Sequence, residues 1–234
     1  MSITIDPSDA LAPGWFVDSD HPDVRGFAES VVEGAVDERD RVRLLFAEVR
    51  DRLRYDPYGV TTDRSQYRAS AILAGGPAWC VPKAVLLTAA LRAVGIPAAL
   101  GFSDVRNHLS SEQLVALMGT DLFIYHGWTA VWVNGRWAKG SPAFNSTLCR
   151  RFGVPALDFD GTDDALLHAT DGSGRRHMEY VSERGTFLDL PFDDIMRALH
   201  DTYGPGLTQG QAREPAPVDP VFDPARRGRR RHQA

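Results

Sequence analysis

The stretch "GGPAWCVPKAVLL", residues 75–87, contains one of the two cysteines in this chain of 234 residues. Pro82 lacks a backbone N–H, so within a helix it is tolerated only in the first turn. The apolar run that follows and the stop signal formed by Gly95 and Pro97 predict a helix from near Cys80 to Gly95. Cys80 is therefore expected at or just before the first turn of this helix.

A cysteine in this position has two interpretations. Free cysteine is among the most buried residue types, so Cys80 can be a small packing residue. Alternatively, the unpaired N–H groups and partial positive charge of a helix start lower a thiol pKa, and the thiolate is the form that attacks. Gly75 and Gly76, just ahead of the helix, would let backbone come close to a substrate. The second interpretation makes Cys80 a nucleophile.

The composition is that of an ordinary soluble protein, with 43% hydrophobic and 24% charged residues. The net charge of -5 favours neither a nucleic acid nor an anionic membrane surface as partner. The N-terminal sequence lacks the pattern of a signal peptide, and no apolar run approaches 18 residues. A reduced cytoplasmic setting is the default expectation, and the two cysteines lack metal-binding spacing. We expect no metal and no cofactor.

The composition divides the chain into three parts. Residues 1–24 are rich in Pro, Asp and Gly and predict an extended lead-in. Residues 25–203 are expected to form a single domain. Residues 204–234 are rich in Pro, Gly, Gln and Arg and predict a disordered tail, whose basic end is interpreted as solvated.

Hydrophobic periodicity predicts several further elements. Residues 37–55 predict an amphipathic helix, because apolar side chains recur at i, i+3, i+4, i+7 and i+11 from Val42. Residues 96–105 predict a strand, and 110–119 predict a short helix with a serine cap. A last helix is expected near 191–203. The region from 150 to 190 gives no clear element.

The dipeptide Asn-Gly at 134–135 separates two aromatic and β-branched runs, 121–133 and 136–144. This is the strongest short signal for a β-hairpin. A two-residue turn pairs Val133 with Arg136. Of the seven histidines, His126 is the one that lies inside an aromatic strand. It is the candidate base for Cys80, the alternative being a strand histidine satisfied by a neighbour.

The hairpin register also suggests what orients this base. His126 would face Ala143, with Ser141 and Asn145 as diagonal neighbours roughly 7–8 Å away. The hydroxyl and the amide oxygen can each accept a hydrogen bond from an imidazole N–H, but neither is a carboxylate. Pro142 lies at this end of the ladder and can distort it.

Taken together, "WCVPKAVLLTAALRAVGIPAAL" at 79–100 and "YHGWTAVWVNGRW" at 125–137 resemble the transglutaminase-like superfamily over roughly residues 40–150. In that family a cysteine opens a central helix, and a histidine strand precedes an aspartate strand. The resemblance implies an α+β, papain-like transglutaminase-core fold, with the nucleophile helix packed on an antiparallel sheet. Residues 159–168 and 172–191 also resemble a bacterial cysteine-protease and acyltransferase branch of the family.

Carried over residue by residue, the resemblance assigns the nucleophile to Cys80 and the base to His126. The family aspartate falls on Ser141, which is a departure, since a hydroxyl stabilises an imidazolium less than a carboxylate does. Asn145 is an alternative third member. Loop aspartates are a further possibility: Asp104, Asp158 and Asp160.

The implied chemistry is attack of the Cys80 thiolate on an amide carbonyl, followed by a thioester that water or an amine resolves. The Cys80 N–H is the expected oxyanion donor, with the Trp79 indole or the Tyr55 phenol as the second. Trp128 is a further candidate for contact with substrate. The expected partners are a peptide, protein or small amide substrate and an amine acceptor, and no nucleic acid or membrane. The alternative is a catalytically degenerate scaffold that binds a peptide or small molecule without turnover.

Other candidate sites are interpreted as structural. Cys149 is expected at a strand end, with arginines beside it but no histidine nearby in sequence. Residues 158–164, "DFDGTDD", lack the ligand spacing of a calcium loop and read as a turn. His168 and His177 have no further ligands at a recognised spacing. Two further tryptophans, at 132 and 137, can line a cleft or belong to the core.

Overall fold

Four strands form one antiparallel sheet in the order β3-β2-β1-β4. In this computed structural model residues 3–204, 219 and 221–222 are described. The strands are β1 (Ala98–Asn107), β2 (Leu122–Val133), β3 (Arg136–Gly140) and β4 (Met178–Phe187). The helices are α1 (Pro22–Val31), α2 (Glu38–Arg52), α3 (Ala69–Ala74), α4 (Cys80–Ala93), α5 (Glu112–Met118), α6 (Ser146–Phe152) and α7 (Phe192–Tyr203), with short 3-10 turns η1 (Asp9–Leu11) and η2 (Arg64–Tyr67).

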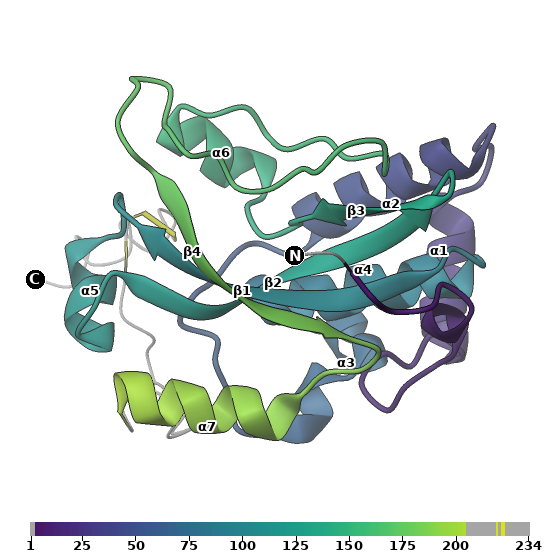
Figure 1. Cartoon of the computed structure of the whole chain (residues 1–234), viewed down its shortest axis with the longest axis horizontal. Coiled ribbons are helices and arrows are strands. Elements are labelled where there is room, and N and C mark those ends of the chain that lie inside the picture. The colour runs from purple at the N-terminus through teal and green to yellow at the C-terminus, as the bar shows by residue number, and fades with distance from the viewer. Residues whose placement is uncertain (1–2, 205–218, 220, 223–234) are drawn as a thin grey trace, which may run out of the picture.

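The helix α4 occupies the centre of the fold. It packs on β1 and β2, and α1, α2 and α3 pack around its other sides (Figure 1). Every residue from Cys80 to Arg92 is buried, which explains why this helix is apolar on all faces rather than along one stripe. Gly95, with a φ of 81°, ends it as predicted. This arrangement confirms the predicted α+β class with a helix packed on an antiparallel sheet.

A buried lysine joins α4 to α2. The Lys83 Nζ donates hydrogen bonds of 2.7 Å to the carbonyl oxygens of Arg50 and Leu53, at the C-terminal end of α2. Carbonyl groups in the last turn of a helix have no partner within the helix, and the Lys83 amine provides one for two of them, although burial lowers its pKa to about 7. Lys83 thus fixes the first turn of α4, and with it Cys80, against α2.

The hairpin has the predicted turn and register. Asn134 and Gly135 both have positive φ, and Val133 pairs with Arg136. The ladder stops at the pair Thr129 and Gly140, so the expected pairing of residues 126 and 143 does not form. Residue 142 is a proline, which has no N–H to give to a ladder.

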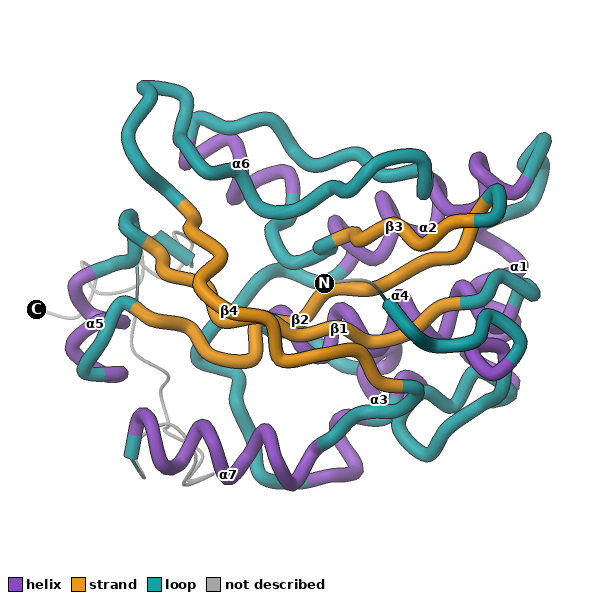
Figure 2. The backbone as a smooth tube through the Cα atoms, in the orientation of Figure 1, coloured by secondary structure: helices purple, strands orange, loops and turns teal. Residues whose placement is uncertain are grey.

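Four of the elements were not evident from the pattern: the helices α1, α3 and α6 and the strand β4. The helix α1 begins within the predicted extended lead-in, and β4 lies in the region that gave no clear prediction. Cys149 lies within α6, so the expectation of a strand end there is wrong. The long loop between α6 and β4 runs beside the sheet, at the top of Figure 2, and its backbone pairs with residue 141.

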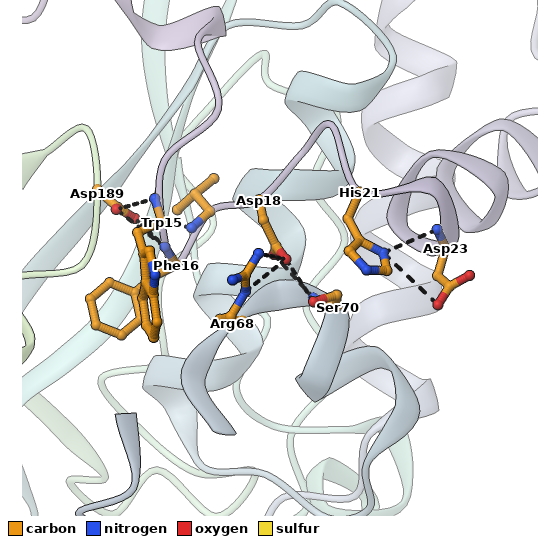
Figure 3. A network of polar contacts seen from close by, with 9 residues as sticks. Trp15, Phe16, Asp18, His21, Asp23, Arg68, Ser70 and Asp189 are labelled. Atoms are coloured by element: carbon orange, nitrogen blue, oxygen red, sulfur yellow. Dashed lines mark hydrogen bonds and ion pairs between the residues drawn. The ribbon is translucent and has the colours of Figure 1, made fainter. Parts of the chain in front are cut away.

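The N-terminal segment is anchored rather than loose (Figure 3). The Asp189 carboxylate accepts hydrogen bonds from the backbone N–H groups of residues 15–17. Asp18, which is buried, accepts from the side chains of Arg68 and Ser70. These contacts tie the lead-in to α3 and to the start of α7.

The predicted tail, 204–234, falls mostly outside the described residues. Asp219, Val221 and Phe222 are described, and Asp219 and Phe222 are buried against the domain. Within the described residues, none of the helices has the length and apolar character needed to cross a membrane.

Candidate active site

Cys80 is the first residue of α4, as the proline in its first turn predicts. The preceding residue, Trp79, gives no side-chain cap, so the first N–H groups of the helix are left for other partners. The backbone N–H groups of Gly127 and Val81 lie close enough to the sulfur to stabilise its thiolate. The side chain is only 6% exposed.

Burial dominates the acid–base properties of this thiol. It raises the pKa of Cys80 to about 11, and the backbone N–H groups and Lys83 offset only part of that rise. The sequence-based expectation of a lowered pKa is therefore wrong for the free protein, because desolvation of the thiolate outweighs the helix start. Burial likewise lowers the pKa of His126 to about 4. The pair is a neutral thiol and a neutral imidazole at physiological pH.

His126 lies in β2, where its imidazole is held by one side chain. The Nε2 atom is 3.1 Å from the Ser141 Oγ, and both side chains are buried. The Tyr180 ring meets the imidazole edge to face, with centroids 6.1 Å apart. Among the described residues, none of the hydrogen bonds to the imidazole comes from Cys80. If Nε2 carries the proton and donates it to Ser141, Nδ1 keeps its lone pair and can act as a base.

A β-bulge sets the direction of this imidazole. The register of β1 and β2 shifts between the pair Ser103–His126 and the pair Val105–Phe123, so two β2 residues oppose one β1 residue. The residue before the histidine, Tyr125, has a φ of 52°, which is uncommon for a bulky residue. Bulges of this kind re-aim side chains next to functional sites.

Asp104 stabilises the bulge instead of acting on the histidine. It accepts a hydrogen bond of 3.2 Å from the Tyr125 N–H and forms an ion pair with Arg184, whose guanidinium also lies 4.9 Å from the Tyr125 ring centroid. Burial by itself raises the Asp104 pKa, but Arg184 and Ser182 hold it below its ordinary value. Asp104 is thus a neutralised strand residue, and the expectation of a free loop aspartate is wrong for it.

The other third-member candidates lie elsewhere. The Asn145 amide oxygen accepts from the Tyr55 N–H at 3.1 Å, and its nitrogen donates to Thr147. Asp158 accepts from the N–H that follows it, and Asp160 is paired with an arginine of α2, Arg39. Of the five candidates, the structure therefore brings Ser141 to the imidazole and gives the other four different partners.

A cavity of about 30 Å³ lies beside Cys80 and His126, both of which line it. Its remaining walls are largely apolar, with Tyr55, Trp79 and Tyr203 as the residues that carry a polar atom. The purely apolar side chains are Pro57, Val60, Met118, Phe123, Ile124 and Leu199. No charged side chain of the described residues lines this cavity. The space suits an uncharged, apolar group next to the sulfur.

Two buried side chains that line this cavity carry a hydrogen-bond donor. The Trp79 Nε1–H is buried without a well-formed partner, and the Tyr67 hydroxyl near it is already engaged with both backbone groups of Thr61. Tyr55 is 6% exposed, and burial, followed by its proximity to Cys80, raises its pKa. A neutral phenol and a neutral indole are suitable donors to a developing oxyanion.

Trp128 does not belong to this site. Its Nε1 donates to the Ser103 Oγ at 2.9 Å, and its ring packs with Ala99 and Ala130 in a second hydrophobic cluster. The neighbouring Thr129 contacts α4, whereas Trp128 does not line the cavity that Cys80 and His126 share. The expectation that it contacts substrate beside Cys80 is therefore wrong. Within the described residues, no three His, Cys, Asp or Glu side chains gather where they could hold a metal ion.

A family model described as the transglutaminase-like superfamily matches residues 25–142, about half of the chain. The chain belongs to the transglutaminase-like superfamily. This confirms the family that the cysteine helix and the histidine strand predict. No curated protein matches this superfamily member.

Two solved structures resemble this transglutaminase-like chain. One is the "putative cysteine protease" from Cytophaga hutchinsonii, with 18% identity and a TM-score of 0.48, covering 80% of this chain and 49% of that one. The other is the "putative protease" from Parabacteroides distasonis, with 17% identity and a TM-score of 0.37, covering 68% of this chain and 30% of that one. The chain thus spans half or less of the length of these proteins.

One residue of the transglutaminase-like site was missed from the sequence. A Cβ atom on Gly127 would lie 3.1 Å from the Val81 Cα and 3.3 Å from the Cys80 carbonyl oxygen. The strand β2 therefore touches the first turn of α4 at a point where a side chain would not fit. A glycine inside an aromatic strand is itself a sign of close backbone approach, and that signal was present in the sequence.

Proposed function

We propose that this protein is a thiol enzyme that transfers the acyl group of an amide, with Cys80 as nucleophile and His126 as base. The observation that carries the proposal is that both side chains line one apolar cavity, while Ser141 holds the far nitrogen of the imidazole. A nucleophile, a base within the same cavity and an orienting group are the three parts that covalent catalysis needs.

The reaction begins with transfer of the Cys80 thiol proton to His126 Nδ1 as the sulfur attacks the amide carbonyl carbon. The carbonyl oxygen becomes an oxyanion, which accepts hydrogen bonds from the Cys80 backbone N–H and from Trp79 or Tyr55. The imidazolium then gives its proton to the leaving nitrogen, the C–N bond breaks, and a Cys80 thioester remains. His126 next takes a proton from water or from an amine, which attacks the thioester carbonyl. The C–S bond then breaks, a carboxylic acid or a new amide leaves, and the imidazolium returns its proton to the Cys80 sulfur.

The resting pair is neutral, so the ions form only when substrate is in place. Entry of an amide brings the carbonyl to the oxyanion donors and makes charge separation favourable at that moment. Ser141 accepts a hydrogen bond from the imidazolium but adds no negative charge. The base is therefore weaker than one with a carboxylate partner, and we expect a slower enzyme.

The test is direct detection of the thioester. The full chain is mixed with p-nitrophenyl esters and with peptide p-nitroanilides that carry a neutral apolar acyl group, and its mass is measured before turnover is complete. We expect a mass gain on Cys80, preserved in Cys149→Ser and absent in Cys80→Ser. Adding a primary amine then divides the products between acid and amide, which separates hydrolysis from transfer.

The opposite outcome is equally clear. If no ester or anilide acylates Cys80 while the folded chain still binds the same acyl groups, the protein is a scaffold that binds without turnover. The 6% exposure of the nucleophile is the feature that makes this alternative worth testing.

A further inference from the structure

A second, small cavity of about 10 Å³ lies beside His126. Its walls include Tyr55 and Phe144, and one wall is Phe222 from the C-terminal segment of the chain. Tyr55 also lines the cavity that contains Cys80. The two cavities thus share Tyr55 and His126, and the C-terminal segment reaches a space that adjoins the candidate nucleophile.

The Phe222 side chain is buried against the aromatic rings of the loop after α2. It is 4% exposed, and its ring lies 5.9 Å from the Tyr55 centroid and 6.3 Å from the Tyr58 centroid. Its carbonyl oxygen accepts a hydrogen bond of 2.8 Å from Arg54, and the carbonyl oxygen of Val221 accepts one of 2.7 Å from Arg151. An aromatic anchor in an apolar pocket, with its backbone carbonyls bound by donors, is how a protein holds a peptide ligand.

Asp219 fixes the other end of this segment. Its carboxylate is 1% exposed and accepts hydrogen bonds from the Tyr58 hydroxyl at 2.6 Å, from the Ser111 hydroxyl and from the Val221 N–H at 2.9 Å. A buried carboxylate with three donors is a built site and not a chance surface contact. Asp219, Val221 and Phe222 are therefore bound by the loop after α2, the start of α5 and the side of α6.

We propose that the pocket filled by the Phe222 ring, which borders this second cavity, is a peptide subsite for a bulky aromatic side chain, and that the chain's own Asp219, Val221 and Phe222 occupy it. As a substrate subsite it rests on the proposed function, because it extends the Cys80 cavity across the shared wall of Tyr55. A segment of the same chain competes at an effective concentration on the order of millimolar, so a free peptide must displace it to bind. The subsite thereby selects aromatic peptides and limits their access.

The test uses a fluorescent peptide with the sequence of residues 218–224, VDPVFDP, and measures its binding to the full chain by anisotropy. Removing the internal anchor with Phe222→Ala should tighten binding of this peptide at least about tenfold relative to the unaltered chain. Val221→Ala is the matched control, because it shortens the neighbouring side chain and leaves the anchor. A peptide with alanine in place of its phenylalanine should bind neither protein.

A second variant tests whether the effect of Phe222→Ala comes from loss of the anchor or from misfolding. Asp219→Asn weakens the anchor but keeps Phe222, and it should also tighten peptide binding, by less than Phe222→Ala. Thermal unfolding of each variant reports that the domain is intact. Equal peptide binding by the unaltered chain and both folded variants, or binding that ignores the phenylalanine, overturns the proposal. If the unaltered chain binds the peptide but no ester or anilide acylates Cys80, the proposed reaction is overturned and the subsite still stands.

Discussion

The two cysteines of this chain are alike in most measures and differ in their surroundings. Cys80 and Cys149 are 6% and 2% exposed, both lie in helices, and burial raises the pKa of both thiols. Cys149, inside the short helix α6, points its Sγ at the Phe144 carbonyl oxygen 3.6 Å away and lines neither cavity that contains His126. A candidate nucleophile is thus distinguished by an adjacent cavity and base, and the resting pKa does not separate the two.

Replacing each cysteine in turn is the most direct test of which one is the nucleophile. Cys80→Ser should lower the rate of acyl transfer at least about 10³-fold, because a hydroxyl is a much weaker nucleophile with this base. Cys149→Ser should change the rate less than about twofold, as expected away from the site. Initial rates with an aryl ester measure both. Equal losses in the two variants would remove the assignment of the nucleophile.

Alkylation in the absence of substrate gives the next largest effect. A pKa of about 11 leaves Cys80 with about a hundredfold less thiolate at pH 8 than an ordinary thiol. Iodoacetamide should therefore modify Cys80 about a hundredfold more slowly in the folded chain than in urea, with a rate that climbs until about pH 11. Rates followed by mass spectrometry of the Cys80 peptide check this. Rapid labelling at pH 6 would mean that the free protein already holds a thiolate.

The same thiol pKa predicts how stability depends on pH. Because the folded pKa is raised above the unfolded value, the folded state retains this proton longer. Its contribution is therefore present below about pH 8.5 and is lost as the pH rises toward 11. Cys80→Ala should flatten this part of the pH dependence in urea unfolding.

Disturbing the contact between β2 and the start of α4 should have a smaller effect on the rate. Gly127→Ala places a methyl group 3.1 Å from the Val81 Cα, and both partners are backbone, so the strand or the helix start must move. A shift of a few tenths of an ångström at the nucleophile should cost about tenfold to a hundredfold in kcat. Gly76→Ala is the matched control, since nothing lies within 4 Å of the added atom. If both variants keep full activity, this contact does not position Cys80.

Some parts of the fold and of the candidate site were predictable from the sequence. The helix that begins at Cys80 and the hairpin at 134–135 follow from local rules, because Pro82 and Asn-Gly restrict the backbone wherever they occur. The register of the hairpin even predicted that Ser141 lies close to His126. Ser141 reaches His126 from the loop after β3, however, and not from a paired position in the ladder. Local signals of this kind survive folding because they do not depend on distant partners.

The remaining parts depend on contacts between distant residues. The Cys80 pKa was predicted in the wrong direction, since the helix start is a local property while the desolvation comes from the surrounding core. The bulge before His126 depends on Asp104 and on Arg184, which lies on a strand that the pattern did not reveal. Phe222 reaches the site from a segment whose composition predicts no structure at all. Tertiary context decided each of these cases.

The smallest expected effect concerns the base that Cys80 has and Cys149 lacks. Ser141→Ala removes the hydrogen bond to His126 Nε2 and should lower kcat about tenfold, because the imidazole loses its orientation but not its basicity. Asn145→Ala is the control, since its amide contacts Tyr55 and Thr147 and not the imidazole. A larger loss in Asn145→Ala than in Ser141→Ala would reverse the assignment of the orienting residue.

The pH profile distinguishes orientation from simple damage to the fold. Activity needs a neutral His126, so kcat/KM of the unaltered protein should fall only as the pH approaches about 4. Ser141→Ala should leave the pH of this fall unchanged and lower the value of kcat/KM above it; the fall is the acidic limb of the profile. Ser141→Asp puts a carboxylate beside the imidazole, which favours the imidazolium, so the limb should move to higher pH. A limb that stays fixed in Ser141→Asp would show that residue 141 does not act on the base, whatever happens to the rate.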